Sequence, residues 1–146
     1  MTNNIDKYGQ FPADGKSLRK DKTVVVVSEP QRLKLLHGQK AGVLCQVAVS
    51  NDYIHEGIVT IPPRVHSEVD SIGGDSVFVP LDGVVSFTIE DSADNPKAVS
   101  RERFVVKPQE KFFLPANTRF RMHNFSSEKV DVIFIAAASP GKGSKR

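Results

Sequence analysis

The sequence predicts an all-β fold, a sandwich or barrel built from short strands. Two observations lead to this prediction: apolar segments recur about every eight to twelve residues, and turn-forming residues lie between them. The apolar segments are 33–36, 43–49, 53–61, 77–81, 84–89, 104–106, 111–114, 118–122 and 130–137. With 39% hydrophobic residues in a chain of 146, one buried core is expected.

The N-terminal part is polar, and we expect residues 1–20 to form a flexible basic tail. The first ordered segment is Thr23–Val27, because its run of β-branched valines favours extended backbone. The best helical candidate, 29–37, starts next to Pro30 and stops at Gly38, so it is long enough for a turn or two at most. We assign 21–139 to one domain and 140–146 to a second flexible basic tail.

The alternation of apolar and polar residues predicts which strand faces are exposed. In 84–89, Val85, Phe87 and Ile89 share one face, while Ser86 and Thr88 share the other, as in a half-exposed antiparallel strand. By contrast, 24–27 is apolar throughout and 130–137 is apolar at both parities beyond Asp131. This pattern predicts that both segments are buried on both faces. Because a two-layer sandwich buries only one face of each sheet, another part of the protein must cover the other face. A second subunit or the chain's own N-terminal strand would serve, and both alternatives stay open here.

Composition excludes several protein classes. No apolar run approaches the about 18 to 20 residues of a membrane-spanning helix. The N-terminus lacks the pattern of a secretory signal, which indicates an intracellular protein. Cys45 has no second thiol to pair with, so we expect a small core residue there. The net charge of +3 comes largely from 16–22 and 141–146, basic ends that favour solubility or, alternatively, DNA binding.

One segment groups three residues able to bind a metal. His66, Glu68 and Asp70 share one parity, so a strand there would project all three from one face and hold a divalent ion. The alternative is a solvated loop, because prolines precede the segment and glycines follow it. His123 shares a face with two arginines, which disfavours its protonation and metal binding.

Two segments about thirty residues apart form a pair of motifs. The first runs from Pro63-x-x-His66-x-Glu68 to 77–83, and the second is 115–124, similar to Pro-x-Gly-x-x-His-x-x-x-Asn. Together they resemble the paired motifs of the cupin superfamily, whose members are jelly-roll β-barrels. The fold implied is a cupin-type jelly roll with an extended N-terminal segment. At two motif positions that bind metal in the family, this chain carries Ser76 and Phe120. The resemblance therefore implies a barrel without a metal or other cofactor.

Within that superfamily, the chain resembles the C-terminal cupin domain of centromere protein C. The segments that carry this resemblance are 54–63, 77–85, 112–126 and 132–137. It implies a non-enzymatic domain that forms a homodimer and recruits a centromere-assembly or kinetochore protein. It also implies a place in the nucleus, at the centromere or kinetochore of the chromosome. DNA or nucleosome contacts through the basic tails are an expectation from their charge alone. The alternative function is a metal-dependent isomerase, cyclase or oxygenase using His66, Glu68 and Asp70.

The sequence suggests residues for both interactions of such a scaffold. The expected dimer interface comprises Val24, Val25, Val26, Val27, Val132 and Phe134. The expected partner pocket is lined by Phe78, Phe120 and Met122, with His66 and Glu68 at its mouth.

Overall fold

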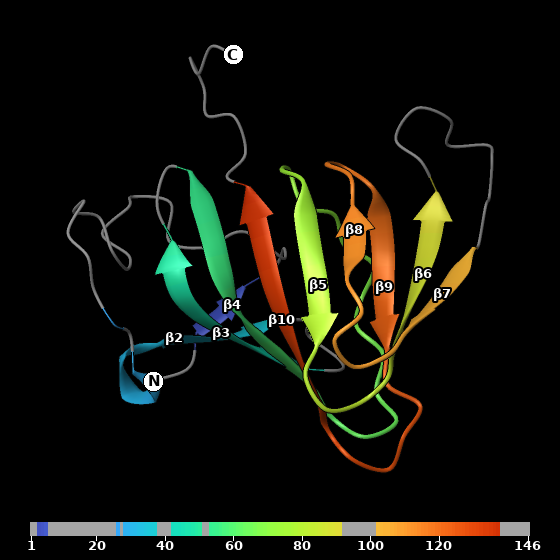
Figure 1. Cartoon of the computed structure of the whole chain (residues 1–146), viewed down its shortest axis with the longest axis horizontal. Coiled ribbons are helices and arrows are strands. Elements are labelled where there is room, and N and C mark those ends of the chain that lie inside the picture. The colour runs from blue at the N-terminus through green and yellow to red at the C-terminus, as the bar shows by residue number, and fades with distance from the viewer. Residues whose placement is uncertain are drawn as a thin grey trace.

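The computed structural model describes residues 3–5, 26, 28–37, 42–50, 53–91 and 102–137 of the chain. Over these ranges the chain forms strands and one 3₁₀ turn (Figure 1). The elements are β1 (Asn3–Ile5), the turn Glu29–Gln31, β2 (Leu33–His37), β3 (Val43–Ser50), β4 (Ile54–Ile61), β5 (Ser76–Pro80), β6 (Val85–Asp91), β7 (Arg103–Val106), β8 (Phe112–Leu114), β9 (Arg119–His123) and β10 (Val130–Ala137). The predicted all-β fold class is confirmed.

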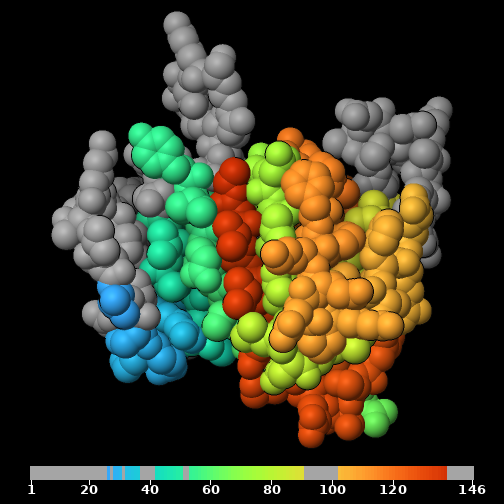
Figure 2. Space-filling view, viewed as in Figure 1, coloured from blue at the N-terminus to red at the C-terminus, as the bar shows by residue number. Residues whose placement is uncertain are grey.

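The described strands form two sheets. The larger has the order β1-β2-β3-β4-β10-β5-β8, and the smaller has the order β7-β6-β9. All neighbouring strands pair antiparallel except β1 and β2, which pair parallel. The C-terminal strand β10 lies at the centre of the larger sheet, between β4 and β5, as its long apolar sequence requires. Figure 2 shows β3, β4, β10 and β5 side by side on the visible face.

Side chains from both sheets share one core. Every second residue of β10 is buried, and the same period of two is seen in β3, β5 and β9. In β6, Val85 and Phe87 are buried and Ile89 packs against the core, as predicted, although Ser86 is buried as well. Cys45 is fully buried in β3, which confirms its assignment to the core.

The structure describes parts of the N-terminal region for which the sequence made predictions. The candidate helix is only the turn Glu29–Gln31, after which β2 begins at Leu33. Within the expected tail 1–20, Asn3–Ile5 forms β1 beside β2. The rest of that tail and all of 140–146 lie outside the described residues. Among the described residues, no helix is long and apolar enough to span a membrane.

Candidate functional site

The inside of the barrel is filled by phenylalanine rings. Phe120, on β9, is 1% exposed, and its ring centroid lies 5.8 Å from that of Phe78 and 6.2 Å from that of Phe87. Phe87 also stacks on Phe112 at 4.4 Å, and Phe134 lies 6.5 Å from Phe78. These spacings are those of attractive aromatic pairs. The position where the cupin motif has a metal-binding histidine therefore belongs to an aromatic core.

Ser76, at the second altered motif position, is not a good metal ligand either. Ser76 begins β5 and is 1% exposed, and its Oγ has no hydrogen-bond partner in the described structure. A neutral hydroxyl is a poor substitute for a carboxylate as a ligand of divalent ions, and Phe120 supplies no donor atom at all. The donor set at these two positions does not fit a bound metal.

The alternative metal site of His66, Glu68 and Asp70 is not assembled. His66 and Glu68 are exposed, whereas Asp70 is buried and its Oδ1 accepts a 2.7 Å hydrogen bond from the Ser71 amide. The segment pairs with β9 through two isolated bridges, His66 with His123 and Asp70 with Phe120. Phe120 points into the core and His123 lies on the opposite face of β9, so His66 and Asp70 do not share one face. Among the described residues, no group of three or more His, Cys, Asp and Glu side chains is placed to hold a metal. The alternative prediction is wrong, and the loop interpretation is the better one.

The predicted partner pocket also differs from the structure. Phe78, Phe120 and Met122 are each at most 1% exposed and point into the shared core. They therefore pack the barrel and do not line an open mouth. His66 and Glu68 lie on the surface beside β9, outside that core.

The predicted interface residues of β10 face the wrong way for a dimer contact. Val132 and Phe134 are 0% exposed, because their parity directs them into the core, where Phe134 packs on Phe78. Of the predicted N-terminal residues, only Val26 is described, and it is 90% exposed; Val24, Val25 and Val27 lie outside the described residues. The prediction that 130–137 is buried on both sides is not met within one chain, since Ile135 is 42% exposed.

The outer face of the larger sheet carries a continuous apolar patch. Phe113 of β8 pairs with Val77 of β5, which pairs with Ile135 of β10. In the next row, Val79 pairs with Ile133, which pairs with Ile58 of β4. Phe113 is 57% exposed, and the remaining residues apart from Ile135 are half-buried. We call these residues the outer patch: Ile58, Val77, Val79, Phe113, Ile133 and Ile135.

The sequence contained a signal for this patch that the prediction did not resolve. Residues 130–137 are apolar at both parities, so the pattern indicates two apolar faces without saying which one points inward. The pairing of Phe134 with Phe78 of β5 and Gly57 of β4 determines which face of β10 points into the core. Because β4 and β5 are far from β10 in the sequence, the local pattern does not contain this information.

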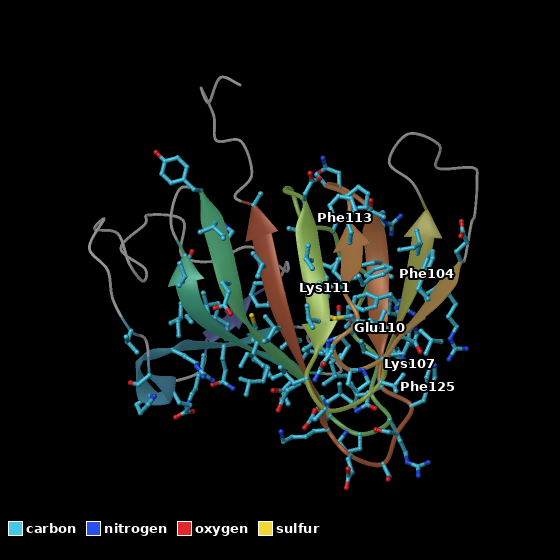
Figure 3. The ribbon with its side chains drawn as sticks, in the orientation of Figure 1. Phe104, Lys107, Glu110, Lys111, Phe113 and Phe125 are labelled. Atoms are coloured by element: carbon cyan, nitrogen blue, oxygen red, sulfur yellow. The ribbon has the colours of Figure 1, made fainter. Side chains whose placement is uncertain are left out.

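A turn between β7 and β8 leads into one end of the outer patch. Glu110 Oε1 accepts a 2.8 Å hydrogen bond from the Lys107 amide, and Gln109, with φ of 70°, donates its amide to Pro80 O at 3.0 Å. Figure 3 shows Lys107 and Glu110 at this turn, with Phe113 farther along β8 and Phe104 nearby on β7. The turn thus holds the chain that enters β8 against the end of β5, and the pairing of the two strands places Phe113 opposite Val77.

The outer face of the smaller sheet has a polar, basic character. The His123 Nε2 and Thr88 Oγ1 atoms lie 2.9 Å apart, and the His123 ring stacks on Phe125, over which Arg103 lies at 4.3 Å. Burial lowers the pKa of His123, and the nearby charges of His66, Arg121 and Arg103 lower it further, against a smaller opposite effect of Glu90. The expectation that cations on this face disfavour protonation of His123 agrees with these causes.

These histidines predict a pH-dependent stability. Burial also lowers the pKa of His55, whose Nδ1 lies 2.8 Å from Ser50 Oγ. Because the folded state resists protonation of His55 and His123, the unfolded state takes up more protons once the pH falls below about 6.5. The free energy of unfolding should therefore decrease below that pH, by no more than about 1.4 kcal/mol per pH unit for each histidine.

Urea unfolding between about pH 7.5 and pH 5.5 measures this dependence. The substitutions His55→Gln and His123→Gln should each make the profile flatter. A profile that both variants leave unchanged would contradict the assignment of the slope to these rings.

Comparison with known proteins supports the fold at low sequence identity. No protein-family model and no curated protein sequence matches the chain. Among solved structures, the Cnp3 cupin domain of Schizosaccharomyces pombe matches with a TM-score of 0.60 and 18% identity, over 80% of this chain and 76% of that one. An RmlC-like cupin family protein with a double-stranded β-helix fold from Methanocaldococcus jannaschii matches with a TM-score of 0.55 and 13% identity, over 72% and 90%. A cupin superfamily protein of Desulfitobacterium hafniense DCB-2 matches with a TM-score of 0.54 and 13% identity, over 70% and 83%. The chain therefore has the cupin fold.

Proposed function

We propose that this cupin-fold chain is a non-enzymatic homodimerisation and protein-recruitment domain of a centromere scaffold protein. The observation that carries the proposal is the outer patch, an apolar surface that crosses β8, β5 and β10. An apolar patch of this kind on a sheet marks an interaction surface, because leaving it in water is unfavourable. Pairing two copies about a two-fold axis covers both patches at once.

The interior of the barrel supports the non-enzymatic part of the proposal. Phe78, Phe87 and Phe120 fill the inside of the barrel, and Phe120 stands at a motif position that binds metal in the family that the sequence resembles. With that space filled by rings, the outer surfaces are left as the places where the domain can act on other molecules. Self-association through the outer patch leaves the smaller sheet available to a recruited protein.

The centromere part of the proposal has two supports. Segments 54–63, 77–85, 112–126 and 132–137 resemble the cupin domain of centromere protein C. The Cnp3 cupin domain is one of the structures whose fold this chain shares. The proposal places the domain in the nucleus, at the centromere or kinetochore, with a kinetochore or centromere-assembly protein as its partner. The basic ends, which lie outside the described residues, would contribute DNA or nucleosome contacts.

Light scattering on purified protein at micromolar concentration tests the dimer. We expect a species of twice 16.1 kDa for the natural chain and of 16.1 kDa for Ile135→Asp, since the carboxylate would be buried without a partner in the interface. The substitution should weaken association by about 100-fold or more, with an unchanged circular dichroism spectrum.

A matched control uses the other sheet. Val105, on β7, is 56% exposed, so Val105→Asp introduces the same charge at a strand position that lies outside the outer patch and is at least as accessible as Ile135. It should leave the dimer intact. A natural chain that stays monomeric, or an Ile135→Asp variant that still dimerises, would refute the interface.

The recruitment part is tested in cells that lack the endogenous protein. A tagged natural chain should concentrate at centromeres, and cross-linking should recover a kinetochore protein with it. A uniform nuclear distribution of the dimeric chain would contradict the proposed location while leaving the dimer interpretation intact.

A further inference from the structure

Strand β7 lies at an edge of the smaller sheet, whose order is β7-β6-β9. Within the described ranges, β7 pairs only with β6, and Figure 1 shows it at the margin of the molecule. Three of its four residues, Arg103, Phe104 and Val105, are exposed, although successive residues point to opposite faces of the sheet. Exposure at both parities is typical of an edge strand.

The hydrogen bonds to β6 show which backbone groups of β7 remain at the edge. The amide of Ile89 donates to Glu102 O at 2.9 Å, and the hydrogen-bonded positions of an antiparallel pair alternate along the strand. In the register of this pair, Phe104 is therefore the next residue bonded to β6. Arg103 and Val105 lie at the positions between, so their N–H and C=O groups point to the open edge.

Apolar side chains accompany this backbone edge. Phe104 is 39% exposed, and its ring centroid lies 5.4 Å from that of Phe112, which stacks on Phe87 of the core. Val105, on the other face of β7, is 56% exposed. A strand added to β7 would therefore place one apolar side chain against Phe104 and Phe112, and a β-branched one against Val105.

Two cations flank the edge. Arg103 lies on β7 itself, and Lys107 follows it at the turn before β8 (Figure 3). In the part of the chain that the structure describes, no carboxylate forms an ion pair with either side chain. The Arg103 guanidinium lies instead over the ring of Phe125, 4.3 Å from its centroid.

These cations determine which kind of strand fits the edge. If two copies of β7 paired antiparallel about Val105, each Arg103 would lie opposite Lys107 of the other copy. Like charges directly opposite each other are unfavourable, whereas opposite charges are favourable. The charges thus disfavour a second copy of β7 and favour a strand with acidic residues at both positions.

We propose that the edge of β7 binds an extended segment of a partner protein with the pattern acid, apolar, β-branched, apolar, acid. The segment adds an antiparallel strand to the smaller sheet. Its acidic residues lie opposite Arg103 and Lys107, and its central residue exchanges two main-chain hydrogen bonds with Val105. This inference deepens the recruitment part of the proposed function and rests on it for the protein that carries the segment. Binding of the segment by the purified chain requires neither the dimer nor the centromere.

NMR titration of the ¹⁵N-labelled full chain with the peptide Asp-Phe-Val-Phe-Asp, acetylated and amidated at its ends, tests the site. The peptide should shift the amide signals of residues 103–107. It should also slow hydrogen exchange at the amides of Arg103 and Val105, whereas the amide of Phe104 is already bonded to β6. The absence of shifts at 103–107 would overturn the site.

Methylation of single peptide nitrogens tests the added strand. A methyl group on the nitrogen of the central valine should weaken binding about tenfold or more, because that N–H faces β7. The same change on the following phenylalanine, whose N–H faces away, is the matched control and should have a much smaller effect. Equal effects of the two methyl groups would overturn the added strand.

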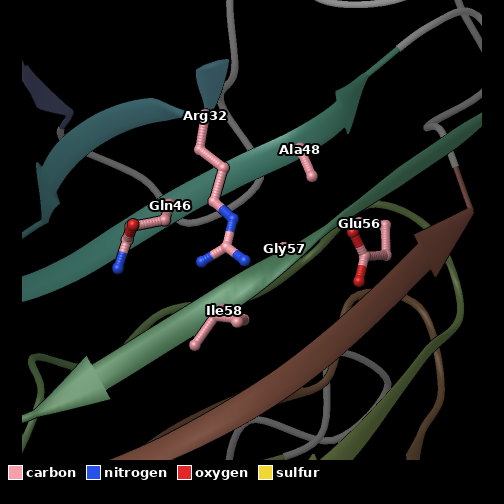
Figure 4. A pocket seen from close by; sticks show the side chains of 6 residues that line it. All are labelled: Arg32, Gln46, Ala48, Glu56, Gly57 and Ile58. Atoms are coloured by element: carbon pink, nitrogen blue, oxygen red, sulfur yellow. The ribbon is translucent and has the colours of Figure 1, made fainter. Parts of the chain in front are cut away.

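A charge exchange tests the register. Arg103→Glu should weaken binding of the acidic peptide by about fivefold or more. Asp-Phe-Val-Phe-Lys should bind this variant better than it binds the natural chain, since antiparallel pairing places its last residue opposite position 103. Lys-Phe-Val-Phe-Asp has the same composition and should not. Arg32→Glu is the matched control, because Arg32 lines a recess over β3 and β4 of the larger sheet together with Glu56 (Figure 4).

Three further outcomes would refute the proposal. The first is that Arg103→Glu binds the acidic peptide as the natural chain does, and the second is that this variant prefers Lys-Phe-Val-Phe-Asp. The third is slow exchange at the amides of Arg103 and Val105 without peptide. Slow exchange that increases with protein concentration would show that a second copy covers the edge, and slow exchange independent of concentration would show that the chain itself covers it.

Discussion

Replacing Phe120 by alanine is expected to lower the free energy of unfolding by about 3–5 kcal/mol. The ring is 1% exposed and contacts the rings of Phe78 and Phe87, which come from both sheets. Removing it leaves a cavity where the two sheets meet, and rigid strands on either side limit how far the structure can relax into it. Urea unfolding at neutral pH measures the change.

Two further substitutions test whether Phe120 acts by packing the core and whether its position can bind a metal. Phe113→Ala removes the same ring from the surface, where Phe113 is 57% exposed, and should change monomer stability far less. Phe120→His restores the imidazole of the cupin motif but should not create a metal site, because Ser76 provides only a hydroxyl at the other altered position. Added zinc, iron or manganese should leave the melting temperature of that variant unchanged. A small effect of Phe120→Ala would mean that the rings do not form a continuous core.

The strands could be predicted because their signal is local. Each apolar segment between turn residues became a strand with bounds within about two residues of those expected, as in β10 at Val130–Ala137. The parity of a strand was predictable where only one face is apolar, as in β6. It was not predictable in β10, where the partners Phe78 and Gly57 decide which face meets the core.

The candidate sites were harder to predict, because they depend on irregular backbone. The metal hypothesis for His66, Glu68 and Asp70 assumed the period of a regular strand, but the segment touches β9 only at two isolated bridges. By contrast, Phe120, which the motif resemblance singles out, lies inside the barrel among other phenylalanine rings.

Asn124 is the motif residue with the largest expected polar effect. It is 1% exposed, and its Nδ2 donates to the carbonyl oxygens of Ile61, Pro62 and Glu128 at 3.0, 3.1 and 2.7 Å. Its Oδ1 accepts from the amide and the hydroxyl of Ser126 at 2.9 and 2.7 Å. One side chain therefore joins the end of β4 to the loop that leads into β10.

We expect Asn124→Ala to lower the free energy of unfolding by about 2–4 kcal/mol, because it removes a buried side chain that makes hydrogen bonds to both the end of β4 and the loop before β10. Asn124→Asp keeps the shape but turns a carboxylate toward three carbonyl oxygens, so it should be at least as destabilising at neutral pH. Burial and those oxygens would raise the pKa of the new carboxyl in the folded state. Its protonation then becomes favourable as the pH falls, so the deficit of the aspartate variant relative to the natural chain should shrink toward pH 4.

Urea unfolding of both variants at about pH 7 and about pH 4.5 distinguishes these effects. The alanine variant has no new titrating group, so its deficit should change little between the two conditions. Ser127→Ala, in the same loop but exposed, is the control for a general weakening of that loop. If aspartate were tolerated at neutral pH, the three carbonyl contacts would not be what holds this loop to β4, and the backbone bond from the Asn124 amide to Val65 O would be the stronger candidate.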